Sequence, residues 1–116
     1  MNLLSRGQFR DAMQSLKQLH DAMPVTMHHY GARKPAAPYG VWAEDQDVSP
    51  GADNVRSTLI FAGTTDYFTK TEDDDNVDAI QAVFDAAGWI SAQISSVQYE
   101  DDTGLVHYEW TWEAVV

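Results

Sequence analysis

The sequence predicts an α+β domain: an antiparallel-rich sheet of about four to five strands packed against two helices. Two segments carry apolar residues at helical spacing. The stretches between and after them are rich in β-branched and aromatic residues or alternate polar with apolar residues, as strands do. The predicted order is helix, three strands, helix, two strands. With 116 residues, 44% of them hydrophobic, the chain is predicted to form a single domain, 1–116, with a hydrophobic core.

The first helix is predicted over residues 5–22. Ser5 can cap its start by accepting a backbone N–H, and Pro24 prevents its continuation. Residues at three- and four-residue spacing align on one face, as expected for an amphipathic helix. These residues are Phe9, Ala12, Met13, Leu16, Leu19 and Met23.

The second helix is predicted over residues 76–87. The polar residues 73–76 offer caps and place negative charge at the positive end of the helix dipole. Gly88 suits the left-handed position that ends a helix. The apolar stripe of this helix consists of Val77, Ile80, Val83, Phe84 and Ala87.

Strands are predicted over the remaining segments, at residues 25–30, 39–44, 55–70, 94–100 and 105–115. Gly63 interrupts the third segment, which is either one bent or bulged strand or two strands joined there. Residues 45–54 are polar and rich in turn formers, so we expect a mobile surface loop. Residues 101–104 form the tight turn between the last two strands.

The final strand alternates between two kinds of side chain. Tyr108, Trp110 and Trp112 share one face, whereas His107 and Glu109 share the other. An aromatic ladder of this kind usually covers a helix in the core, and we favour that over an exposed subunit contact.

Charge is distributed unevenly along the chain. The formal net charge is −11, but residues 1–40 carry +3 and residues 41–116 carry −14. So acidic a protein is a poor candidate for binding nucleic acid and should be repelled by anionic lipid. There is no cysteine and no apolar run long enough to span a bilayer, so we expect a soluble intracellular domain.

Candidate metal ligands have simpler explanations. The acidic cluster at residues 72–75 and 78 invites a calcium interpretation, but it lacks the spacing and glycine of an EF-hand, so helix capping is favoured. His28 and His29 are adjacent and point to opposite faces of a strand, while His20 and His107 are isolated in sequence. We therefore predict neither a metal site nor a cofactor.

No catalytic signature is present. The sequence has no nucleophile elbow and no glycine-rich phosphate loop. The carboxylate pairs Glu100/Asp101 and Glu109/Glu113 flank a predicted hairpin turn, where acidic residues are ordinarily only solvated. We predict that the protein is not an enzyme. An enzyme would require histidines and carboxylates from distant segments to converge.

Several segments resemble a family of small tail-completion proteins encoded in phages and prophages of Gram-positive bacteria, and the resemblance covers residues 5–114. The segments are 24–30 (PVTMHHY), 38–42 (PYGVW), 63–70 (GTTDYFTK), 98–104 (QYEDDTG) and 107–110 (HYEW). The resemblance implies a structural virion protein of the tail-terminator, head–tail joining or minor capsid type. It implies a sheet flanked by helices, a ring that is often hexameric, and contacts to the tail tube or connector. It also implies location in the virion, and in the host cytoplasm during assembly.

A ring requires one surface of a subunit to meet a different surface of the next. The oppositely charged halves of this chain supply material for such a contact, although the same gradient is also typical of a merely soluble acidic surface. The alternative function is a small bacterial module that binds a ligand or partner through its tryptophan-rich face. The candidate interface residues lie in a basic loop and an acidic loop: Arg33, Lys34, Glu44, Asp45, Asp47 and Asp53.

Overall fold

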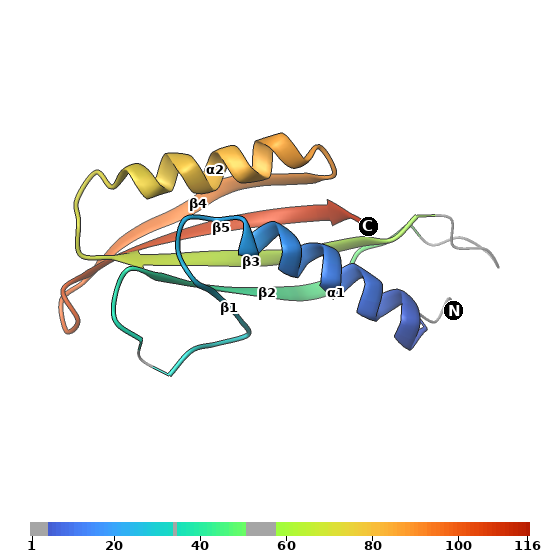
Figure 1. The fold of residues 1–116 in the computed structure, drawn as a ribbon, viewed down its shortest axis with the longest axis horizontal. Coiled ribbons are helices and arrows are strands. Elements are labelled where there is room, and N and C mark those ends of the chain that lie inside the picture. Colours follow the sequence, from blue (N-terminus) through green and yellow to red (C-terminus); the bar gives the residue numbers. More distant parts are fainter. Residues whose placement is uncertain (1–4, 34, 51–57) are drawn as a thin grey trace.

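The computed structural model describes residues 5–33, 35–50 and 58–116. It contains two helices and five strands in the predicted order (Figure 1). Their bounds are α1 Arg6–Asp21, β1 Met27–His29, β2 Tyr39–Asp47, β3 Ile60–Thr69, α2 Asp75–Ala87, β4 Ile90–Glu100 and β5 Leu105–Val115. The α+β prediction is confirmed.

The strands form a single five-stranded sheet in the spatial order β1-β2-β3-β5-β4. All neighbouring pairs are antiparallel except β1 and β2, which are parallel. The two edges of the sheet are therefore the three-residue β1 and the eleven-residue β4. In Figure 1, α2 runs along β4, and α1 crosses the strands nearer the other edge.

Local capping explains where the helices begin and end. Ser5 and Gln8 form a capping box at the start of α1, each side chain bonding the other's backbone N–H. Asp74 caps α2 by accepting from the N–H of Asn76, and Gly88 follows the helix with φ +79°. Both predicted helices are thus confirmed, with ends that differ from the prediction by at most one residue.

One face of the sheet carries the core. Alternate residues of β3 and β5 are buried, and both helices pack on them. Phe9 of α1 contacts Phe61 edge to face, and Phe84 of α2 packs against Trp110. The core includes Leu16, Trp42, Phe61, Tyr67, Ile80, Phe84, Trp110 and Trp112.

Several strand bounds differ from the prediction. Strand β1 is shorter than 25–30, and β3 begins at Ile60 rather than 55, although residues 51–57, which include parts of the predicted loop and strand, lie outside the described residues. The largest differences are in β2 and β4. Strand β2 continues through Asp45 to Asp47, where the sequence suggested a loop. The acidic residues are accommodated because this end of β2 has β3 on one side only, and charged residues are favoured on such exposed edges. Strand β4 begins at Ile90, four residues earlier than predicted, because Ile90 and Ala92 pack inward directly after Gly88.

The third strand is continuous through Gly63, so it is not divided in two. The shifts in strand register occur in other strands instead, between Glu44 and Gln46 of β2 and between Ile94 and Ser96 of β4. Gly63 is required by close packing: a Cβ there would lie 2.4 Å from the Ala43 carbonyl oxygen and 2.5 Å from the Trp112 ring. Neither neighbour can move easily, because one is strand backbone and the other a buried indole.

Replacing Gly63 should therefore destabilise the protein. We expect Gly63→Ala to lower the free energy of unfolding by about 1–3 kcal/mol or more, through overpacking. Gly31→Ala is the matched control, because a Cβ at Gly31 meets nothing within 4 Å. Urea denaturation of both variants tests this, and equal stability of the two would contradict the packing argument.

Candidate functional site

A buried chain of hydrogen bonds joins α1 to the sheet. His20, 0% exposed, places Nδ1 2.7 Å from the Leu16 carbonyl oxygen and Nε2 2.7 Å from Thr65 Oγ1. Trp112 Nε1 donates to the same Thr65 oxygen at 2.9 Å. A neutral His20 satisfies every group: its Nδ1–H donates to Leu16, and its Nε2 accepts the Thr65 hydroxyl proton. Burial lowers the pKa of His20 to about 4, which keeps it neutral.

Four aromatic rings are stacked from this buried chain out to the surface. His20 stacks on Trp42 at 4.6 Å, Trp42 on His29 at 3.8 Å, and His29 on Tyr30 at 3.7 Å between ring centroids. Glu44 holds the outer end, with Oε1 2.8 Å from His29 Nε2 and Oε2 accepting from the Tyr30 hydroxyl. That hydrogen bond raises the pKa of Tyr30 to about 12. The stack fixes the edge of the sheet to the core.

The tryptophan-rich face is therefore the interior of the protein. Trp42, Trp110 and Trp112 are each 3% exposed or less. Trp110 Nε1 donates to Gln81 Oε1 of α2 at 2.8 Å, so its polar group is also satisfied inside the fold. The preference for a core over an exposed contact is confirmed.

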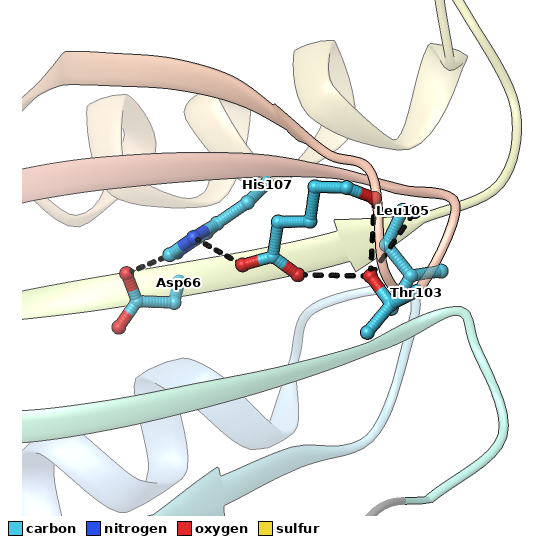
Figure 2. A network of polar contacts seen from close by, with 5 residues as sticks. Asp66, Thr103, Leu105 and His107 are labelled. Atoms are coloured by element: carbon cyan, nitrogen blue, oxygen red, sulfur yellow. Dashed lines mark hydrogen bonds and ion pairs between the residues drawn. The ribbon is translucent and has the colours of Figure 1, made fainter.

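The opposite face of the sheet, here called the open face, is covered by no element of the described chain. Figure 2 is seen from this side, with the helices behind the strands. Cross-strand register places five chemically important side chains on it, from three strands. They are Asp66 and Phe68 of β3, Glu100 of β4, and His107 and Glu109 of β5.

His107 is the centre of a polar network on the open face (Figure 2). Its Nε2 lies 2.8 Å from Asp66 Oδ1, and its Nδ1 lies 3.6 Å from Glu100 Oε2. Thr103, in the turn, donates to Glu100 Oε1 at 3.1 Å, and its hydroxyl accepts from Leu105 N–H at 3.3 Å. The network ties the β4–β5 turn to the middle of the sheet.

Aromatic rings form a row across the same face. Tyr39 of β2 stacks on Phe68 of β3 at 4.8 Å, and Phe68 stacks on His107 of β5 at 4.3 Å. His28 of β1 meets Tyr39 edge to face. Tyr39 and Phe68, and Phe68 and His107, are directly opposite each other on neighbouring strands, so the strands hold the row rigidly.

The open face is negatively charged. Burial raises the pKa of Asp66, and the charges of Glu109 and Asp45 add to this effect, while the hydrogen bond and charge of His107 oppose it. A shallow hollow of about 380 Å³ lies on this face, and its lining includes Asp45, Ser91, Gln93, Thr111 and Glu113. None of the five strands contains a lysine or an arginine.

The outer edge of the sheet exposes apolar side chains. Ile94, Val97 and Tyr99 of β4 are 42%, 55% and 65% exposed. They share the helix side of the sheet, as their partners Trp110, Tyr108 and Val106 do. An exposed apolar patch on a sheet edge is typical of a protein–protein contact.

The predicted interface residues are not all available for contacts. Arg33 is exposed on its loop, and Lys34 and Asp53 lie outside the described residues. Glu44, placed in a loop by the sequence analysis, belongs to β2, and its side chain is only 12% exposed because His29 and Tyr30 bind it.

Asp45 and Asp47 also belong to β2, but both remain exposed. Asp45 lies at the strand irregularity and lines the hollow, whereas Asp47 accepts from the N–H and hydroxyl of Ser49.

Sequence reasoning missed Asp66 and Phe68. The alternation of buried and half-buried residues in β3 places both on the open face, but both faces of this strand mix polar and apolar residues, so the sequence does not show which face each residue joins. Their pairing with His107 depends on the register between β3 and β5, which joins segments about forty residues apart. A histidine and carboxylates from distant segments do come together here, the convergence that an enzyme would require.

Other candidate sites gain no support. In the described part of the chain, no group of three or more histidine, aspartate or glutamate residues is arranged to hold a metal ion. Asp74, in the acidic cluster, accepts hydrogen bonds from Tyr67, Thr69 and the Asn76 N–H. Burial opposes ionisation of Asp74, but these bonds outweigh it and lower the pKa of this carboxyl group. No helix among the described residues is both long and apolar enough to cross a membrane.

Comparison of the sequence with protein-family models and with curated proteins finds no match.

The buried His20 predicts a specific loss of stability in acid. The unfolded chain binds a proton near pH 6.5, whereas folded His20 does so only near pH 4, so stability is fully present above pH 6.5 and falls as the pH drops towards 4. We expect His20 to contribute about 2 kcal/mol to the fall in unfolding free energy between pH 7 and pH 4.5.

The control for this prediction is His20→Gln, which can still bond Leu16 and Thr65 but cannot titrate. Urea denaturation at both pH values should show a smaller fall for the variant than for the native protein. An equal fall would mean that His20 is not the group responsible.

Proposed function

We propose that this protein is a structural component of a phage virion, a tail-terminator or head–tail joining protein. It acts by forming a ring of subunits, a hexamer in many members of the family that it resembles, and by binding the end of the tail tube or the connector. No covalent chemistry is involved. It belongs to the virion, and to the host cytoplasm during assembly. The sequence resemblance over residues 5–114 supports this function, and so does a sheet flanked by helices, the architecture that the resemblance implies.

The observation that carries the proposal is a rigid sheet with two uncovered surfaces. The open face bears a fixed row of aromatic and acidic side chains, and the β4 edge exposes Ile94, Val97 and Tyr99. A subunit of a ring needs two different contact surfaces, and a ring that joins other components needs a further one. Because the strands already hold these side chains in place, binding costs them little conformational entropy.

An enzymatic function is less well supported. Both ring nitrogens of His107 face carboxylates, Asp66 on one side and Glu100 on the other. Neither nitrogen is bonded to a hydroxyl group that the imidazole would activate as a nucleophile. The network is better explained as a brace between the β4–β5 turn and the sheet.

The alternative of a small ligand-binding module loses its binding surface. It depended on an accessible tryptophan-rich face, and the indole rings of that face are buried under the two helices. A ligand would have to displace α1 or α2 to reach them.

Co-expression with the neighbouring virion proteins tests the proposal. We expect the genes beside this one to encode capsid and tail-tube proteins, and the tagged protein to co-purify with the tail-tube or connector protein. Negative-stain electron microscopy should show rings, or tubes closed at one end. A neighbourhood without virion genes, together with no binding to tails or connectors, would contradict the proposed function.

A further inference from the structure

Positive charge in the folded elements is confined to one helix. The strands contain no lysine or arginine, and α2 contains none either. Helix α1 contains Arg6, Arg10 and Lys17. Within the helices and strands, basic side chains therefore lie only on α1, which also carries Asp11 and Asp21, whereas the open face is negative.

The basic residues of α1 form a stripe beside apolar side chains. Positions 6, 10 and 17, with Met13 between, follow helical spacing and share one side of the helix. Phe9 and Met13 are half-buried and line a surface hollow together with Arg6 and Arg10. We call Arg6, Phe9, Arg10 and Met13 the α1 stripe.

The two arginines of the α1 stripe have no internal role. Both are exposed, and neither forms an ion pair with any residue that the structure describes. By contrast, Lys17 is paired with Asp21 at 2.6 Å. Arg6 and Arg10 are thus free to bind carboxylates of another molecule.

We propose that the α1 stripe of one copy binds the open face of the next copy, at the hollow beside Asp45 and Glu113. The inference rests on the proposed function, in which the protein assembles with itself, and it names the two surfaces that meet. Both are exposed and of opposite charge, and no described element covers either one.

Charge decides against the symmetric arrangements. Joining two open faces would bring Asp45, Glu109 and Glu113 of one copy against the same carboxylates of its partner. Joining two α1 stripes would oppose arginine to arginine. Like charges in contact cost several kcal/mol, so of the three ways to pair these two surfaces, the stripe-to-face contact is the attractive one.

This contact is also of the kind that builds a ring. The helices and the open face lie on opposite sides of the sheet (Figure 2), so the contact joins two different surfaces of neighbouring subunits. Such heterologous contacts propagate from copy to copy until the rotation closes.

Two charge reversals test the contact from its two sides. Arg10→Glu changes the α1 stripe, and Glu113→Arg changes the open face. Both residues are exposed, and glutamate is a good helix former, so both variants should fold. Each variant alone should associate with itself about tenfold more weakly than the native protein, measured by sedimentation velocity at low salt.

Mixing the two variants gives the decisive result. The glutamate introduced by Arg10→Glu then faces the arginine introduced by Glu113→Arg, and the unchanged surfaces meet each other as in the native protein. The exchanged charges again attract, so the mixture should assemble more strongly than either variant alone. Lys70→Glu and Asp102→Arg, both at exposed positions, make the same changes of charge elsewhere and should leave assembly unchanged.

The outcomes separate this inference from the proposed function. If the native protein assembles and binds tails but the variants do so equally well, the stripe-to-face contact is wrong and the function stands. If the native protein stays monomeric at low salt, or the mixture fails to assemble, the contact is also overturned. The proposed function itself is decided by binding to the tail tube or connector.

Discussion

The buried hydrogen-bond chain from Leu16 through His20 and Thr65 to Trp112 is the constraint on which the arrangement of the fold depends. It joins α1 to the two central strands at the middle of the core. The Leu16 carbonyl, the His20 imidazole, the Thr65 hydroxyl and the Trp112 indole N–H are buried, so each needs a partner within the protein. Leaving one unpaired would cost about 1–3 kcal/mol. The bonds therefore hold α1 at one position along the sheet, in addition to its apolar packing against the core face. With α2 on the same side, the other face of the sheet remains open.

Much of the fold followed from local patterns in the sequence. Apolar spacing and capping residues such as Ser5 and Gly88 determined both helices, because the signals that end a helix lie within a few residues of it. Strand ends were harder to predict. Asp45 and Asp47 have turn-like local preferences, and they join β2 only because β3 supplies partners for this end of the strand.

The candidate surfaces were predictable only in part. The alternation in β5 placed His107 and Glu109 on one face, but the position of Asp66 beside His107 depends on a register that no local pattern specifies. Likewise, the sequence revealed a basic and an acidic half of the chain without showing where they lie. Folding places the carboxylates of β2, β3 and β5 on the open face and leaves Arg6 and Arg10 on the outside of α1, while α2 adds further carboxylates on the helix side.

Stability and assembly should consequently respond to different conditions. The core depends on a neutral histidine and on buried hydrogen bonds, which salt screens little. The stripe-to-face contact depends on exposed charges, whose attraction dissolved salt screens. Added salt should separate the subunits while leaving each one folded. Mild acid acts on the fold, because protonation near pH 4 removes the acceptor that Thr65 requires on His20. If the protein dissociates in salt while still folded, and unfolds in acid, then exposed charges hold the subunits together and the buried hydrogen bonds of His20 hold the fold.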